Sequence, residues 1–85
     1  MESGLTLYSR TGCHLCEDMK NQLHSCLDGA GFSFTEVFID DDPSLENQYG
    51  TLVPVLKAGE RELCHYFLDL KALQQYMSEV GIPLI

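Results

Sequence analysis

The feature that most constrains the fold is a change of hydrophobic period within the first 27 residues. Apolar and polar side chains alternate over residues 4–9, which is typical of a half-buried β-strand. After the turn-forming pair Thr11-Gly12, apolar positions recur every three or four residues, as on one helix face, at Cys16, Met19, Leu23, Cys26 and Leu27. The sequence therefore predicts a strand, a turn and a helix that ends at the glycine-rich residues 28–31.

Three more strands and two more helices are predicted further along the chain. Alternation and turn residues place the strands at residues 32–39, about 55–57 and 62–66. One helix is expected from Pro43 to about Tyr49, after Asp42 as its N-cap, and the last helix follows Asp69 and is closed by Gly81 and Pro83. The order βαβαββα indicates an α/β protein, and the chain contains no repeat or linker.

Length and composition indicate one folded domain covering residues 1–85. A chain of 85 residues has room for a single modest core, and 45% hydrophobic with 21% charged residues is ordinary for a folded globule. The net charge is −8, and the five Lys and Arg residues are scattered along the chain. Nucleic acid is therefore not expected as a partner, because binding to phosphates needs clustered positive charge.

The start of the chain and its four cysteines bear on the compartment. Residues 1–4 carry no basic leader, and the apolar stretch after them is short, so we expect neither a signal peptide nor a membrane span, and no membrane partner. These observations predict a cytoplasmic location. In a reducing compartment, paired cysteines usually serve redox or metal chemistry rather than a disulfide scaffold.

Cys13 and Cys16 are the strongest candidates for catalysis. The predicted turn and helix place Cys13 at a helix N-terminus, where free backbone N–H groups and the helix dipole stabilise a thiolate. Cys16 lies about one turn further on, on the apolar stripe, within reach of a mixed disulfide at Cys13. The pattern predicts that Cys13 attacks and Cys16 resolves.

Charged residues beside the pair are expected to tune the Cys13 thiolate in opposite directions. Arg10 adds positive potential before the pair, whereas Glu17 and Asp18 oppose a negative sulfur from the first helical turn. His14 has two interpretations: a cation next to Cys13 when protonated, or an ordinary surface residue.

The arrangement of these motifs resembles the glutaredoxin family over nearly the whole chain. The similarity consists of strand, Gly12-Cys13-His14-Leu15-Cys16 and helix, followed by Val53-Pro54 before a hairpin and a final helix. It implies the thioredoxin fold, with a four-stranded mixed sheet flanked by helices, and dithiol–disulfide exchange without a cofactor. It also implies that Pro54 is cis and that Val53 offers its backbone N–H and C=O to a substrate. The residues expected at the substrate are Arg10, His14, Val53, Pro54 and Asp69.

The sequence departs from the family before its last helix. Glutaredoxins usually carry a glycine pair there, where backbone amides receive glutathione, whereas this chain has bulky residues at 65–68, followed by Asp69. Side chains in place of glycines obstruct access to the amides, and Asp69 adds negative charge. We therefore expect glutathione to be a poor substrate and other small-molecule or protein disulfides to be the partners.

The same residues allow other interpretations. Zinc bound by Cys13, Cys16, Cys64 and a histidine is a possible alternative, but no second paired motif supports it. Cys26 and Cys64 fit small core positions better. A core role is also expected for five aromatic residues: Tyr8, Phe34, Phe38, Phe67 and Tyr76. A non-catalytic binding module or an iron–sulfur cluster carrier is the second functional hypothesis.

Overall fold

A computed structural model describes residues 4–27, 29 and 33–80. Its elements are β1 (Leu5–Ser9), α1 (His14–Leu27), β2 (Phe34–Phe38), α2 (Pro43–Tyr49), β3 (Val55–Ala58), β4 (Arg61–His65) and α3 (Leu70–Glu79). The predicted order βαβαββα and the α/β class are confirmed. Gly81 and Pro83, which were expected to close the last helix, lie outside the described residues, as does most of the turn expected at 28–31.

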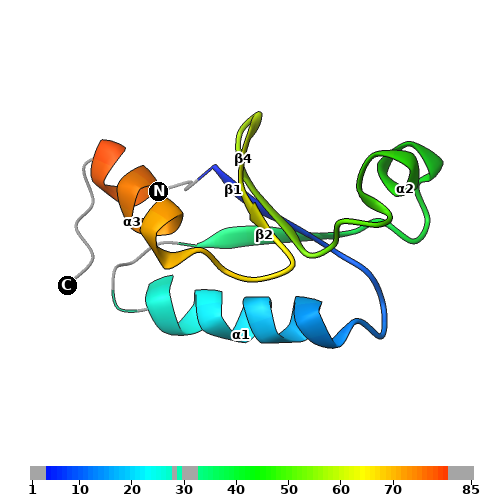
Figure 1. The fold of residues 1–85 in the computed structure, drawn as a ribbon, viewed down its shortest axis with the longest axis horizontal. Helices are drawn as coiled ribbons and strands as arrows, with labels where there is room; N and C mark the ends of the chain where they lie inside the picture. The colour runs from blue at the N-terminus through cyan, green and yellow to red at the C-terminus, as the bar shows by residue number, and fades with distance from the viewer. Residues whose placement is uncertain (1–3, 28, 30–32, 81–85) are drawn as a thin grey trace.

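The four strands form one mixed sheet in the order β2-β1-β3-β4 (Figure 1). β1 pairs in parallel with β2 and antiparallel with β3, which in turn pairs antiparallel with β4. In this register Tyr8 lies between Val37 and Val55. The end of β1 therefore meets the start of β3, so the segments after Ser9 and before Val55 lie at the same end of the sheet.

Alternate side chains of the sheet belong to two hydrophobic clusters. On one face Leu5, Leu7 and Leu56 pack with residues of α1 and α3, among them Met19, Leu23, Leu73 and Met77. On the other face Val55 packs with Ile39 and with Tyr49 of α2. Figure 1 shows α1 running along the underside of the sheet. The period of two in β1 thus determines which residues face α1.

The two shorter helices begin at the predicted caps. The Asp42 carboxylate accepts hydrogen bonds from the backbone N–H groups of Ser44 and Leu45, and Pro43 fills the first helical position, where no donor is needed. The Asp69 carboxylate accepts the Ala72 N–H at 3.1 Å. Each cap satisfies N–H groups that have no partner within the helix.

The prediction that five aromatic residues belong to the core is wrong for two of them. Phe38 is 50% exposed and Phe67 is 70% exposed. Phe38 lies at the end of the edge strand β2, which has a neighbour on one side only, and Phe67 lies in the connection between β4 and α3. Tyr8, in contrast, stacks on Tyr49 with ring centroids 4.5 Å apart.

Candidate active site

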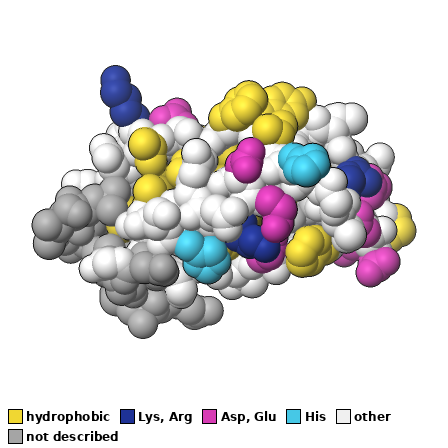
Figure 2. Space-filling view, turned by 90° about the horizontal axis from the view of Figure 1, so that it is seen from below, with side chains coloured by type: hydrophobic (Ala, Val, Ile, Leu, Met, Phe, Trp, Pro, Cys, Tyr) yellow, Lys and Arg dark blue, Asp and Glu magenta, His cyan; other side chains and the backbone are white. Residues whose placement is uncertain are grey.

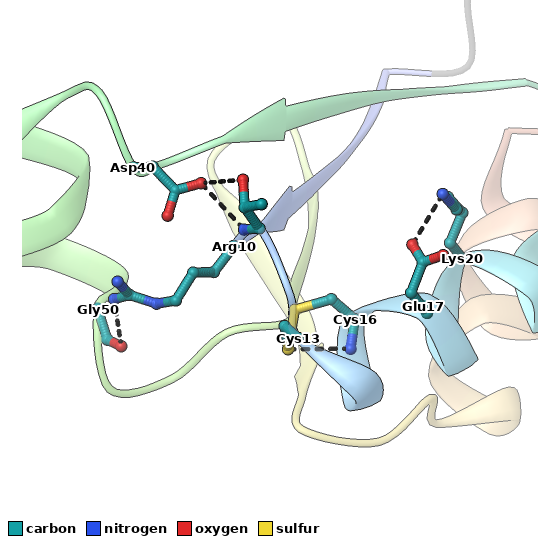
Figure 3. Close-up of a disulfide and its surroundings, with 8 residues drawn as sticks. Arg10, Cys13, Cys16, Glu17, Lys20, Asp40 and Gly50 are labelled. Atoms are coloured by element: carbon teal, nitrogen blue, oxygen red, sulfur yellow. Dashed lines mark hydrogen bonds and ion pairs between the residues drawn. A yellow bond between two sulfur atoms is a disulfide. The ribbon is translucent and has the colours of Figure 1, made fainter.

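The cysteine pair lies at the N-terminus of α1, as the sequence predicted. Cys13 takes the N-cap position: its carbonyl accepts the Glu17 N–H at 3.1 Å, which is the first helical hydrogen bond. Cys13 and Cys16 form a disulfide with Cα atoms 5.2 Å apart, and the Cys16 N–H donates to Cys13 Sγ at 3.1 Å (Figure 3). The Cys13 sulfur therefore stands where a capping oxygen would stand, directed at the positive end of the helix.

The two sulfur positions differ in access to solvent. Cys13 is partly exposed, whereas Cys16 is 2% exposed and begins the buried stripe of α1. A substrate disulfide can reach only the first of them without a change in the helix. The geometry suits an attacking residue at 13 and a resolving residue at 16.

The turn before Cys13 is fixed by a contact with the end of β2. Gly12 has φ of 75°, a conformation that side chains disfavour, and so turns the chain sharply into α1. Thr11 donates its backbone N–H and its hydroxyl to one carboxylate oxygen of Asp40, at 2.9 and 2.7 Å. These hydrogen bonds lower the pKa of the Asp40 carboxyl below its ordinary value. The turn is thus anchored to the neighbouring strand.

The sequence does not predict the Thr11–Asp40 contact; of the three residues at 40–42 it indicates a role only for Asp42, as the cap of α2. A usable signal existed. Thr11 follows β1 by two residues and Asp40 follows the parallel strand β2 by two, so parallel pairing brings them to the same edge. A hydroxyl and a carboxylate at matched positions after two parallel strands lie close enough to form a hydrogen bond that joins the strand ends.

Arg10 is directed away from the cysteine pair. Its guanidinium forms an ion pair with Glu46 of α2. It also donates to the carbonyl of Gly50, which ends α2, at 3.0 Å (Figure 3). The structure therefore uses the Arg10 charge to hold α2 against the end of β1. It does not bring this side chain to Cys13, and a role for Arg10 at the substrate stays a prediction.

Val53 and Pro54 lie at the end of the sheet that carries the cysteine turn. Their peptide bond is cis, Pro54 is buried, and its carbonyl accepts the Tyr66 N–H at 2.9 Å. The Val53 N–H donates to the Tyr49 carbonyl at 3.1 Å. The expectation that both Val53 polar groups are open is thus wrong, because the turn after α2 consumes the N–H. Of the two Val53 groups, the carbonyl is the one without a hydrogen-bond partner among the described residues.

The connection between β4 and α3 forms a side-chain rim near this segment. Tyr66 has a positive φ of 66°, and its hydroxyl donates to the Thr51 carbonyl at 2.7 Å. Phe67 follows it and is exposed, and Asp69 is engaged as the cap of α3. His14, on the first turn of α1, is exposed. No sequence signal predicted the left-handed backbone at Tyr66, because glycine is the residue that usually adopts this conformation.

The described residues contain neither a cluster of metal ligands nor a membrane-spanning helix. Among residues 4–27, 29 and 33–80, no three His, Cys, Asp or Glu side chains lie close enough together to hold a metal ion. None of the helices described is both long and apolar enough to cross a bilayer.

Comparison with known protein families assigns the chain to one of them. Residues 4–78 match the model of the Glutaredoxin-like domain (DUF836). The chain belongs to this glutaredoxin-like family. No curated protein gives a significant match.

Solved structures of similar sequence support the assignment. Protein Ne2328 from Nitrosomonas europaea is 38% identical, with a TM-score of 0.78 over 89% of this chain and 92% of that one. Protein XcR50 from X. campestris, in its solution structure, is 39% identical, with a TM-score of 0.71 over 93% and 97%. Thioredoxin 1 from Thermosipho africanus, 13% identical, has a TM-score of 0.59 over 91% and 97%. The last match shows the fold alone, and the glutaredoxin-like chain has the thioredoxin fold.

Proposed function

We propose that this glutaredoxin-like protein is a thiol–disulfide oxidoreductase in which Cys13 attacks and Cys16 resolves. The observation that carries the proposal is the asymmetry of the pair: a partly exposed sulfur that accepts an N–H at the α1 N-terminus, bonded to a buried sulfur one turn further on. A helix N-terminus favours the thiolate form of Cys13, and the thiolate is the reactive form.

The reaction follows from this geometry in two exchanges. In the reduced protein, the Cys13 thiolate attacks a substrate disulfide R–S–S–R′, forms the mixed disulfide Cys13–S–S–R and expels R′–S⁻. Cys16 then attacks the Cys13 sulfur, closes the Cys13–Cys16 disulfide and expels R–S⁻. Two electrons pass from the cysteine pair to the substrate, and an external thiol must return them. The Cys16 N–H stabilises negative charge on Cys13 before the first step and whenever Cys13 is the leaving group.

Protein disulfides suit the surroundings of the pair better than glutathione does. Large apolar side chains are exposed near the pair: Leu15 lies on the first turn of α1, and Tyr66 and Phe67 lie in the connection between β4 and α3. Figure 2, which looks onto α1, shows hydrophobic side chains gathered along one edge of this face. A tripeptide with two carboxylates gains little from such a surface, whereas an apolar polypeptide segment buries area on it.

The proposal is tested by the redox couple of the purified protein. We expect one two-electron couple in mixtures of reduced and oxidised dithiothreitol, measured after acid quenching and thiol labelling. Cys13→Ser and Cys16→Ser should each abolish it, whereas Cys26→Ser should retain it, because Cys26 lies on the last turn of α1. Survival of the couple in Cys13→Ser would show that another pair carries it. The Cys16→Ser variant should also accumulate mixed disulfides at Cys13.

A further inference from the structure

The last residue of β1 carries a buried hydroxyl without a partner. Ser9 is 0% exposed, and within the described residues no group forms a hydrogen bond with its Oγ. Its backbone carbonyl, in contrast, accepts the Ile39 N–H at 2.9 Å. A buried hydroxyl left unpaired is costly and uncommon in folded proteins. Alanine would fill nearly the same space without this cost, so the hydroxyl calls for an explanation.

The strand period places Ser9 on the face that α1 covers. Buried residues alternate along β1, and Leu7 and Leu5, two and four positions earlier, pack with Met19 and Leu23 of α1. Side chains two residues apart on a strand point to the same face. Ser9 therefore continues the row that lies under α1.

The helix places Cys16 over this end of the strand. The buried stripe of α1 starts at Cys16 and continues through Met19 and Leu23. α1 begins five positions after Ser9 and runs back along the sheet, so its first turn covers the end of β1. Figure 3 shows the disulfide beside the point where β1 ends. The buried hydroxyl and the buried sulfur thus share one end of one interface.

We propose that Ser9 is a positioning residue whose hydroxyl donates a hydrogen bond to Cys16 Sγ in the reduced protein. The inference rests on the proposed function and concerns its resolving step. Thiol and disulfide sulfurs are both weak acceptors, and a thiolate is a strong one, but only reduction frees the Cys16 sulfur from the S–S bond, so that it can turn toward the Ser9 hydroxyl. Reduction of the pair therefore supplies the partner that the hydroxyl lacks in the disulfide form.

The hydrogen bond would hold the resolving sulfur in its buried position until the mixed disulfide forms. In the resolving step, Cys16–SH and Cys13–S–S–R give Cys13–S–S–Cys16 and R–SH. The proton of the Cys16 thiol leaves with the expelled sulfur, and Ser9 keeps its own proton throughout. When the disulfide closes, the hydroxyl loses its acceptor again. Ser9 thus favours the dithiol over the disulfide.

The equilibrium between the two redox forms tests this role. Ser9→Ala should lower the equilibrium constant for reduction by dithiothreitol about tenfold, since one hydrogen bond is lost in the dithiol alone. This change corresponds to a potential about 30 mV more negative for a two-electron couple. Thr6→Ala is the matched control, because it removes a hydroxyl from the same strand on the opposite face, and it should leave the constant unchanged.

Each outcome of this comparison decides the proposal. If Ser9 only fills space, Ser9→Ala alters the stability of both redox forms alike and leaves the equilibrium constant at the unmodified value, which overturns the inference. A shift toward the dithiol overturns it as well. In both cases the couple itself persists, so the proposed function stands. Loss of the couple in the unmodified protein would instead remove the proposed function.

A measurement on the unmodified protein covers the case in which Ser9→Ala does not fold. In NMR spectra of the reduced protein, the Ser9 hydroxyl proton should exchange slowly and show a cross-peak to the Cys16 β-protons. After oxidation the same proton should exchange faster. A rapidly exchanging Ser9 hydroxyl in the reduced form would overturn the proposal without any substitution.

Discussion

At the scale of single residues, the cysteines differ in what surrounds their sulfur atoms. Cys13 Sγ accepts a backbone N–H at the start of a helix and is partly exposed. Cys64 is buried in the cluster between the sheet, α1 and α3, and this burial raises the pKa of its thiol. Cys26, near the end of α1, is half-buried. Only the first environment favours a reactive thiolate.

These differences predict the order of alkylation in the reduced protein. At pH 7, iodoacetamide should modify Cys13 first and Cys64 last. The rate at Cys64 should rise only above the pH at which a free thiol ionises, about 8.5, because its raised pKa keeps it protonated. Peptide mapping at timed intervals between pH 6 and 10 measures both rates. Modification of Cys64 or Cys26 ahead of Cys13 would contradict the assignment of the nucleophile.

Sequence patterns could place Cys13 and Cys16 because their positions depend on local structure, namely a strand, a turn and a helix. They could not place the Arg10 guanidinium, whose partners Glu46 and Gly50 lie 36 and 40 positions away. Nor could they show that the Val53 N–H is taken by the turn after α2. Contacts of this kind depend on how α2 sits above the sheet, which no periodicity encodes.

At the scale of elements, alternation and capping residues predicted every helix and strand with ends within a residue or two of those described. Exposure was predicted less well where an element ends. Phe38 continues the alternation of β2 but lies at the end of an edge strand, and Phe67 lies beyond β4. Periodicity gives the direction of a side chain but does not show whether a neighbouring element extends far enough to cover it.

The connection from β4 to α3 is the element whose conformation the sequence least explains. Tyr66 adopts a left-handed backbone, which costs a non-glycine residue about 1–2 kcal/mol, and its hydroxyl bonds to Thr51. We expect Tyr66→Gly to be more stable than Tyr66→Ala by about 1 kcal/mol, because both lose the side-chain contacts and only glycine relieves the backbone. Urea unfolding of the two variants measures the difference. Equal stabilities would show that this backbone is not strained.

At the scale of the whole molecule, the core between the sheet, α1 and α3 is the larger of the two clusters of the described residues, with nine buried members against three in the cluster beside α2. α3 offers a matched pair of leucines for testing it: Leu73 is fully buried in this cluster, and Leu70 is 50% exposed. Leu73→Ala should lower the free energy of unfolding by about 2–5 kcal/mol, and Leu70→Ala by less than about 0.5 kcal/mol. Urea titration of the oxidised protein measures both. Similar losses in the two variants would mean that α3 is not held by this core.

The charge of the molecule also bears on which disulfides the proposed activity would favour. The net charge is −8, and three of the positive side chains, Arg10, Lys20 and Arg61, each form an ion pair with a glutamate. Their positive charge is therefore compensated locally, and the surplus carboxylates define the field that a substrate meets. Such a field raises the encounter rate of cations and lowers that of anions.

Three small disulfides that differ mainly in charge isolate this effect: cystamine is a dication, hydroxyethyl disulfide is neutral and dithiodiglycolate is a dianion. At low ionic strength the reduced protein should consume cystamine about tenfold faster than dithiodiglycolate, with the neutral compound between them. Raising the salt from 0.01 to 0.1 M shortens the screening length from about 30 to about 10 Å and should narrow the ratio. The comparison uses single-turnover rates of the reduced protein. Each is divided by the rate at which dithiothreitol reduces the same compound, which removes differences in intrinsic reactivity. A preference that does not change with salt would place selectivity in direct contacts at the site, and a faster dianion would contradict the expectation that anionic glutathione is a poor substrate.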